Sequence, residues 1–157
     1  MIQQGDKLPE ATFQLLTNDG MQNPTTDELF AGKKVILFAV PGAFTPTCSE
    51  AHLPGYVVSA DKLKEKGVDS IICLAVNDAF VMKAWGDTQN AEEIIMLADG
   101  DAAFTKAIGL DMDTSAFGGI RSQRYAILVE DGVVTELNVE KAKEFEASKA
   151  ETMLELL

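Results

Sequence analysis

The sequence predicts an α/β domain with a central mixed β-sheet and helices packed on both of its faces. Two patterns support this fold class: apolar runs that lead into helix starts in the first half, and a strand–turn–strand pattern near the end. The 157 residues, 46% of them hydrophobic, can form a core without disulfide or metal staples. We therefore expect one domain over residues 1–157, without linkers, repeats or low-complexity tracts.

The first half of the chain contains two strands of the buried type. Val35–Val40 and Asp69–Val76 are apolar, β-rich runs next to turn residues, a pattern typical of strands covered on both faces. A polar pair, Asn77-Asp78, follows the second run and can cap a helix over Ala79–Trp85. This order predicts a central strand, and then a strand that leads directly into a helix.

The second half predicts shorter elements and a hairpin. Ile94–Ala98 is a short strand candidate, and Ala102–Ile108 fits a helical turn or two. Arg124–Val129 and Val133–Val139 flank Asp131-Gly132, which readily adopts the positive φ angles of a two-residue turn. These two strands should therefore be antiparallel neighbours.

Two helix starts are predicted by capping boxes. Thr25 with Glu28, and Ser148 with Glu151, fit the pattern in which a hydroxyl and a carboxylate cap the same helix reciprocally. The second pair should begin a final helix whose apolar face includes Met153.

The charge balance and the cysteine count exclude several functions. The 13 basic and 25 acidic residues give a formal net charge of −12, which repels nucleic acids and anionic membrane surfaces. No apolar stretch approaches membrane-spanning length and the first residues do not resemble a signal peptide, so we expect a cytoplasmic protein. With one histidine, His52, and no Cys-x-x-Cys pair, we expect neither a metal site nor a cofactor.

The segment most informative about chemistry is Pro41–Cys48, PGAFTPTC. It joins the first buried strand to a helix expected to begin between Thr47 and Glu50, and Pro46 suits the first turn of that helix. Unpaired N–H groups at a helix start stabilise negative charge, so the thiolate form of Cys48 is favoured. The alternative is a small buried apolar residue, as most free cysteines are. The polar neighbours of Cys48 favour a reactive thiol.

The same segment resembles the active-site signature of peroxiredoxins, Pro-x-x-x-Thr-x-x-Cys, filled here by Pro41, Thr45 and Cys48. The strings PGAFTPTCSEAHLPGY, VNDAFVMKAW and RYAILVEDGVV resemble the five-type group of that family, which includes the plant type II enzymes. These blocks extend the resemblance over nearly the whole chain. The resemblance implies a thioredoxin-like fold and a thiol-dependent peroxidase that reduces hydrogen peroxide and organic hydroperoxides.

The resemblance also implies roles for individual residues. Cys48 would attack a peroxide oxygen and become a sulfenic acid, while water or an alcohol leaves. Thr45 would hydrogen-bond thiolate and peroxide, Pro41 would shield the thiolate, and the backbone N–H groups of Thr47 and Cys48 would bind peroxide. Arg124 would stabilise the thiolate and the departing oxygen. Without the resemblance, Thr45 would be a helix cap, Pro41 a strand terminator and Arg124 half of a surface ion pair.

Four further residues near these positions are more ambiguous. Phe44 and Phe117 would line the mouth of the site, although Phe117 fits an ordinary core residue equally well. Arg121 is expected to form a surface ion pair, because the chain carries so many carboxylates. His52 lies about one helical turn after the reactive cysteine, but the family mechanism needs no histidine base, so we expect His52 to be structural.

The sulfenic acid must be reduced by a second thiol, and Cys73 is the only other cysteine. Its position resembles that of the second cysteine of plant type II enzymes, so Cys73 is a possible resolving cysteine. Its apolar surroundings, Ile71–Val76, predict a buried and unreactive thiol. We therefore favour an external reductant, either glutathione with glutaredoxin or thioredoxin acting directly.

Two other functions share a reactive cysteine that follows a strand. A thioredoxin-like disulfide oxidoreductase normally uses Cys-x-x-Cys, but Thr45 stands where the first cysteine would be. A non-enzymatic redox sensor would pass the oxidation of Cys48 to a partner protein. The resemblance favours catalysis, and it also implies a homodimer with Phe80–Trp85 as a candidate contact.

Overall fold

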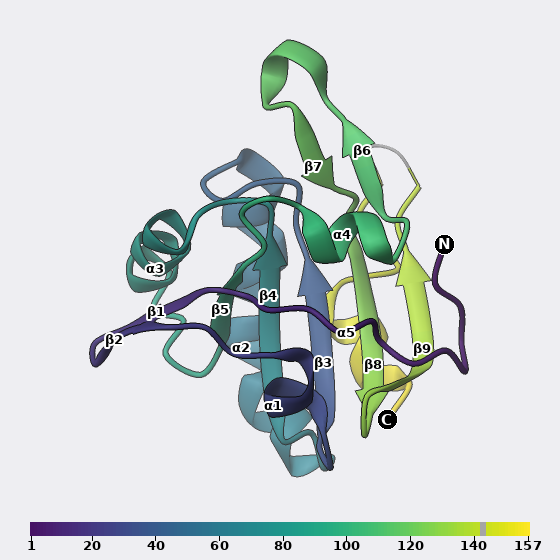
Figure 1. Cartoon of the computed structure of the whole chain (residues 1–157). Coiled ribbons are helices and arrows are strands. Elements are labelled where there is room, and N and C mark those ends of the chain that lie inside the picture. The colour runs from purple at the N-terminus through teal and green to yellow at the C-terminus, as the bar shows by residue number, and fades with distance from the viewer. Residues whose placement is uncertain (142–143) are drawn as a thin grey trace.

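The computed structural model describes residues 1–141 and 144–157 and has a central five-stranded sheet (Figure 1). The strand order is β5-β4-β3-β8-β9, and the sheet is mixed because β3 pairs parallel with β4 and antiparallel with β8. Its strands are β3 (Lys34–Ala39), β4 (Ser70–Ala75), β5 (Ile95–Ala98), β8 (Tyr125–Glu130) and β9 (Val133–Val139). The predicted central mixed sheet is confirmed.

Helices cover both faces of this sheet, as Figure 1 shows with α1 and α4 in front and α2 and α5 behind. Alternate residues of β3 point to opposite faces, so Phe38 packs in one core cluster and Leu37 in the other. Among the described residues, no helix is both long and apolar enough to span a bilayer. The helices are α1 (Thr26–Phe30), α2 (Leu53–Glu65), α3 (Ala79–Thr88), α4 (Ala103–Ala107) and α5 (Ala150–Glu155).

The predicted hairpin and the helix after β4 both form. Asp131 and Gly132 have φ angles of 50° and 77°, so both occupy the left-handed region that a two-residue turn between β8 and β9 requires. The Asp78 side chain accepts a hydrogen bond from the Val81 N–H at 2.9 Å and caps α3, which continues three residues past Trp85 to Thr88. Both predictions are therefore confirmed, with a longer helix than expected.

One predicted capping box is confirmed and the other is wrong. Thr25 and Glu28 cap α1 reciprocally, each side chain accepting from the backbone of the other at 3.3 Å. Helix α5 forms, but it begins at Ala150 without a side-chain cap. The Ser148 hydroxyl donates to the Glu140 carboxylate at 2.7 Å instead, a partner that local sequence does not reveal.

Two small hairpins were not predicted. Strands β1 (Leu15–Thr17) and β2 (Gly20–Gln22) form one, and β6 (Asp111–Asp113) and β7 (Ile120–Ser122) form the other. Each strand has three residues, which is too short for an alternating pattern to stand out. A 3₁₀ turn, Ser115–Phe117, lies between β6 and β7.

Candidate active site

Cys48 is the first residue of a π-helical segment, Cys48–His52, which lies between β3 and α2. The Leu53 N–H donates to the carbonyl of Cys48, five residues earlier. Pro54 explains this wider turn, because it has no N–H to donate and its ring would clash with the carbonyl four residues back in a regular helix. The helix therefore begins where expected, but its first part is not a regular α-helix.

The sheet brings Arg124 to Cys48. Tyr125 at the start of β8 pairs with Ala39 at the end of β3, so the residue before Tyr125 lies beside the segment that carries the cysteine. Arg124 Nη2 donates to Cys48 Sγ at 3.1 Å, and the cysteine is fully buried. A fixed positive charge at this distance stabilises a thiolate. The contact is the one that the resemblance implies, while the catalytic role stays a prediction.

His52 holds the other arm of the same guanidinium. The ring donates from Nε2 to the carbonyl of Ser148, at 3.1 Å, because a carbonyl can only accept. Nδ1 is then unprotonated, and it accepts from Arg124 Nη1 at 2.7 Å. Burial, followed by the Arg124 charge, lowers the pKa of His52 from 6.5 to about 3. The ring is therefore neutral at neutral pH.

The expected structural role of His52 is only part of what the fold gives it. His52 is fully buried and packs against Phe38, with ring centroids 4.9 Å apart, as a structural histidine would. Its contact with Arg124 was missed, because the two residues are 72 positions apart in the chain. A further contact was missed for the same reason: the guanidinium lies 5.8 Å from the ring centroid of Phe145.

Pro41 and Thr47 lie with Arg124 around a cavity of about 350 Å³. Other residues lining it include Met112 and Phe145. Cys48 itself does not line the cavity, but Arg124, which is hydrogen-bonded to its sulfur, does. The structure thus places three of the predicted site residues around one opening.

Thr45 is placed differently from the expectation. Its hydroxyl donates to the carbonyl of Gly42 at 2.7 Å, so its single proton is not directed at Cys48. The hydroxyl oxygen keeps its acceptor capacity, and the Ser49 N–H donates to the Thr45 carbonyl at 2.9 Å. In this state Thr45 orders the turn before the helix. Its oxygen can still accept from a peroxide O–H, but donation to sulfur or peroxide would need the hydroxyl to rotate.

Three expectations about neighbouring side chains need correction. Phe44 and Phe117 are 54% and 70% exposed and do not line the cavity beside Arg124. Phe117 is therefore not a core residue either. Arg121 forms no ion pair with a described carboxylate, and its guanidinium donates to the carbonyls of Gly118 and Val76 at 3.0 and 3.4 Å. Gly118 is 3 positions from Arg121 in the chain and Val76 is 45 positions away, and the local sequence does not predict the contact with Val76.

Cys73 lies within the sheet, as its sequence context predicts. It is on β4, opposite Phe38 of β3, and it is fully buried. Burial raises the pKa of the Cys73 thiol well above its ordinary value, and a negative charge on Cys48 would raise it further. A thiol in this setting is unreactive until the protein opens locally.

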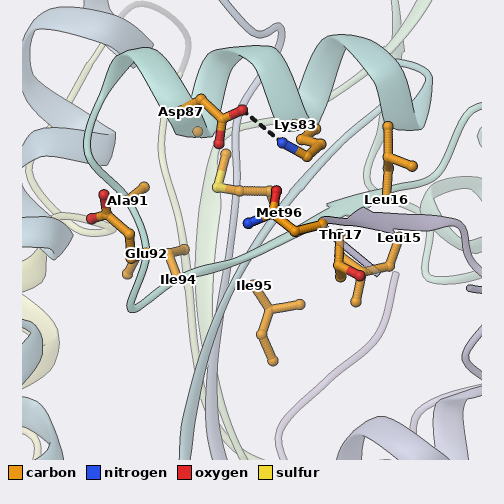
Figure 2. Close-up of a pocket in the computed structure, with 12 residues that line it drawn as sticks. Leu15, Leu16, Thr17, Lys83, Asp87, Ala91, Glu92, Ile94, Ile95 and Met96 are labelled. Atoms are coloured by element: carbon orange, nitrogen blue, oxygen red, sulfur yellow. Dashed lines mark hydrogen bonds and ion pairs between the residues drawn. The ribbon is translucent and has the colours of Figure 1, made fainter. Parts of the chain in front are cut away.

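A second cavity, of about 330 Å³, shares no lining residue with the cavity beside Arg124 (Figure 2). It is formed by β1, the second half of α3 and β5, with apolar side chains such as Leu16 and Met96. Lys83 and Asp87 form an ion pair of 2.8 Å at its edge. None of the predicted site residues lines this cavity.

Comparison with known proteins identifies the family of this chain. The Redoxin family model matches residues 3–154. The chain is 49% identical to Peroxiredoxin-2D of Arabidopsis thaliana over 156 residues, which are 98% of this chain and 96% of that protein. It is 68% identical to reduced Prx3 of Vibrio vulnificus, solved in complex with hydrogen peroxide, with a TM-score of 0.98 over 99% of both chains. The chain therefore belongs to the Redoxin family, as a peroxiredoxin, and is a thiol-dependent peroxidase with a thioredoxin-like fold.

Proposed function

We propose that Cys48 is the peroxidatic cysteine and that Arg124 activates it. The single observation that carries this proposal is the hydrogen bond of 3.1 Å from Arg124 Nη2 to Cys48 Sγ at the start of a helix. The thiolate sulfur forms a bond with one peroxide oxygen while the O–O bond breaks. The other oxygen leaves with the electron pair of that bond and is protonated to water or an alcohol. Cys48 is left as a sulfenic acid, oxidised by two electrons.

The substrates proposed are hydrogen peroxide and organic hydroperoxides. The cavity beside Arg124, about 350 Å³, falls in the size range of small-molecule sites and is larger than hydrogen peroxide needs. Met112 and Phe145 supply apolar surface for an alkyl group. The similar Vibrio vulnificus protein was solved with hydrogen peroxide, which supports that substrate for this chain.

We infer that the reductant is external, with glutathione and glutaredoxin favoured over thioredoxin. One reductant thiol attacks the sulfenic sulfur and releases water, and a second thiol then breaks the mixed disulfide. The burial of Cys73 within β4 and its raised pKa support a route that does not use it. A disulfide between Cys48 and Cys73 would also need Cα atoms within about 7 Å.

The mass of the intact protein tests this scheme. After one equivalent of hydrogen peroxide, the reduced protein should gain the mass of one oxygen atom. A loss of two hydrogens without a change in chain number would instead make Cys73 the resolving cysteine. As a control, Cys73→Ser should gain the same oxygen and keep most of its turnover with glutathione and glutaredoxin. An inactive Cys73→Ser protein would contradict an external reductant.

The redox-sensor alternative is separated by turnover. An enzyme supplied with glutathione and glutaredoxin consumes many equivalents of peroxide, whereas a sensor is oxidised once per chain. A disulfide oxidoreductase is disfavoured, because Thr45 provides no second thiol near Cys48 and its hydroxyl is bonded to Gly42. The cytoplasmic location stays a prediction.

We also propose a homodimer that forms beside the active site. Phe44, Phe80 and Phe117 are 54%, 67% and 70% exposed. Phe44 lies in the loop after β3, Phe80 is the second residue of α3, and Phe117 ends the 3₁₀ turn before β7. Hydrogen bonds join these three segments. The Ala43 N–H donates to Asn77 Oδ1, and the Arg121 guanidinium donates to the carbonyls of Gly118 and Val76. Large exposed aromatic side chains on segments that are joined by hydrogen bonds are typical of a protein–protein interface.

Sedimentation measures the oligomeric state directly. The wild-type protein should sediment as a dimer, and Phe80→Glu should shift it to monomer, because a buried unpaired carboxylate opposes association. Val58→Glu is the matched control, since Val58 is 82% exposed and lies on α2, outside the three segments that carry these phenylalanines. A monomeric wild-type protein, or equal dissociation by both variants, would argue against this surface.

A further inference from the structure

A chain of hydrogen bonds extends from the reactive thiol to the C-terminal segment. Cys48 Sγ accepts from Arg124 Nη2, and Arg124 Nη1 donates to His52 Nδ1. His52 Nε2 donates to the carbonyl of Ser148, and the Ser148 N–H and hydroxyl both donate to Glu140 Oε2. None of the steps proposed above uses His52, Glu140 or Ser148. All three are at most 9% exposed, so solvent does not substitute for these contacts.

We propose that His52 is a positioning residue of the peroxidase: its Nδ1 lone pair holds the Arg124 guanidinium against Cys48 Sγ, and the hydrogen bonds between Glu140 and Ser148 keep His52 in the tautomer that can do so. This inference rests on the proposed function, because it assigns His52 a role through Arg124 and Cys48.

The surroundings of Arg124 explain why its guanidinium needs a second hydrogen-bond partner to fix its orientation. A guanidinium has five N–H donors, and only one arm is bonded to the sulfur. Glu144 lines the same cavity as Arg124, so a carboxylate is available to attract the second guanidinium nitrogen away from this position. A carboxylate in place of His52 would accept a hydrogen bond from Arg124 Nη1, but it would offset the positive charge that stabilises the thiolate. A neutral imidazole accepts the same hydrogen bond from Arg124 and leaves that positive charge in place.

The acceptor at Nδ1 depends on what happens at Nε2. The carbonyl of Ser148 accepts two hydrogen bonds, from His52 Nε2 at 3.1 Å and from the Tyr56 hydroxyl at 2.7 Å. An unprotonated Nε2 would place two acceptors against each other, so the carbonyl keeps the proton of the ring at Nε2. If the carbonyl moved away, the proton could shift to Nδ1 and would then face the N–H of Arg124. The position of Ser148 is therefore linked to the orientation of the arginine.

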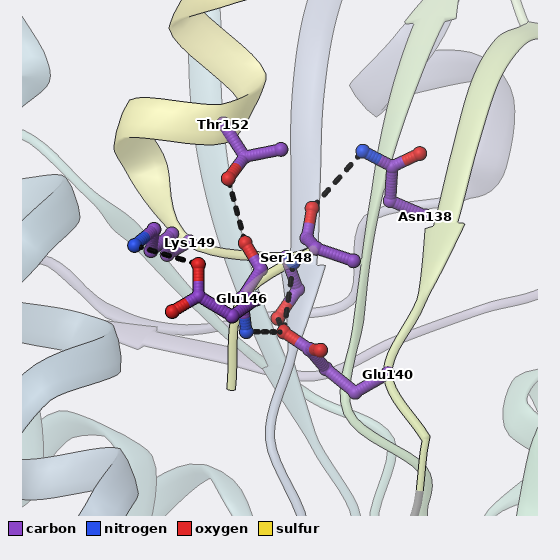
Figure 3. A network of polar contacts seen from close by, with 7 residues as sticks. Asn138, Glu140, Glu146, Ser148, Lys149 and Thr152 are labelled. Carbon is purple, nitrogen blue, oxygen red and sulfur yellow. Dashed lines mark hydrogen bonds and ion pairs between the residues drawn. The ribbon is translucent and has the colours of Figure 1, made fainter. Parts of the chain in front are cut away.

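Glu140 fixes the position of Ser148 (Figure 3). Its Oε2 accepts from the Glu146 N–H at 2.8 Å, from the Ser148 N–H at 2.9 Å and from the Ser148 hydroxyl at 2.7 Å. Burial opposes the charge of this carboxylate, but the hydrogen bonds outweigh burial and lower the pKa of Glu140. The N–H of Glu140 also donates to the carbonyl of Arg124 at 2.9 Å. One residue thus constrains both the arginine backbone and the segment that contacts His52.

Two substitutions of His52 separate its two hydrogen bonds. The amide oxygen of Asn reaches about where Nδ1 lies, so His52→Asn keeps an acceptor for Arg124 and loses the donor to Ser148. The amide nitrogen of Gln reaches about where Nε2 lies, so His52→Gln keeps the donor and loses the acceptor. If His52 acts through Arg124, His52→Gln is the damaging change and His52→Asn restores function.

The readouts are the pH midpoint of thiolate formation and the kinetics with hydrogen peroxide. The midpoint is taken from the ultraviolet absorbance of the thiolate, in a Cys73→Ser background in which Cys48 is the only thiol. His52→Gln should raise this midpoint and lower kcat/KM by about tenfold to a hundredfold, as misplaced catalytic groups do. His52→Asn should stay close to the starting protein in both measurements.

Tyr56→Phe is the matched control, because it removes the other donor to the same carbonyl and does not contact Arg124. It should raise the thiolate midpoint far less than His52→Gln does, because His52 still donates to the carbonyl and still accepts from Arg124. Equal effects of His52→Gln, His52→Asn and Tyr56→Phe would overturn the positioning role and indicate general destabilisation. A Cys48→Ser protein that keeps its activity would overturn the proposed function itself, so the two failures are distinguishable.

A second variant keeps the inference testable if the His52 variants do not fold. Glu140→Gln leaves His52 in place and weakens the contacts that hold Ser148. It also removes a negative charge from the cavity, which by itself would lower the thiolate midpoint, so a rise would report on the lost contacts. We expect Glu140→Gln to raise the thiolate midpoint in the same direction as His52→Gln, by a smaller amount. An unchanged midpoint in folded Glu140→Gln would show that the contacts between Glu140 and Ser148 do not help His52 to position Arg124.

Discussion

Cys48→Ser is expected to reduce peroxide consumption to the level of the buffer control. A serine hydroxyl does not ionise near neutral pH, so the Arg124 contact at 3.1 Å no longer produces a nucleophile. The side chain is fully buried and changes only sulfur for oxygen, so the fold should be kept. The loss would therefore report on chemistry rather than on unfolding.

Peroxide consumption with glutathione and glutaredoxin is the measurement, with circular dichroism to check that the variant folds. Cys73→Ser serves as the control, because it makes the same atomic change at the other buried cysteine. Consumption by Cys48→Ser at the wild-type rate would show that the reactive group lies elsewhere in the chain.

Arg124→Gln should have the second-largest effect, a loss of about a hundredfold to a thousandfold in kcat/KM. This corresponds to about 2.7–4 kcal/mol of barrier, the range found when one donor to a developing negative charge is removed. Gln keeps polar N–H groups but removes the charge that stabilises both the thiolate and the departing oxygen. Arg124→Lys should recover only part of the loss, because one ammonium cannot bond His52 and Cys48 in the same fork geometry.

Arg121→Gln is the matched control for this prediction. It removes the same charge three positions earlier, from a guanidinium that contacts the carbonyls of Gly118 and Val76 and not the sulfur. Its kcat/KM should fall far less than that of Arg124→Gln. Equal losses for the two variants would mean that overall positive charge near the cavity matters, and not the contact with Cys48.

Much of the fold was predictable from the sequence because its signals are local. Apolar runs mark β3 and β4, and Asp131-Gly132 marks the turn between β8 and β9. The same holds for one part of the site, since Pro41 and Cys48 lie within a single loop and helix start. Residues this close in the chain are placed by backbone rules that act over a few positions.

Other features depended on partners that only folding brings together. Ser148 and Glu151 fit a capping box, yet the Ser148 hydroxyl binds Glu140, because a carboxylate from the end of β9 competes for it. Arg121 was expected to pair with a carboxylate, and the folded loops offer it carbonyls instead. In each case a local pattern was correct in chemistry and wrong about the partner.

The division is sharpest at the active site. The reactive cysteine and its setting at a helix start were readable from the sequence, and the resemblance added Arg124. The contact between Arg124 and His52 joins residues 72 positions apart, and the contact between His52 and Ser148 joins residues 96 apart. No propensity or spacing rule acts over such separations. Both contacts are set by the pairing of β3 with β8 and by the packing of the C-terminal segment, because these side chains meet only after the sheet has aligned their backbones.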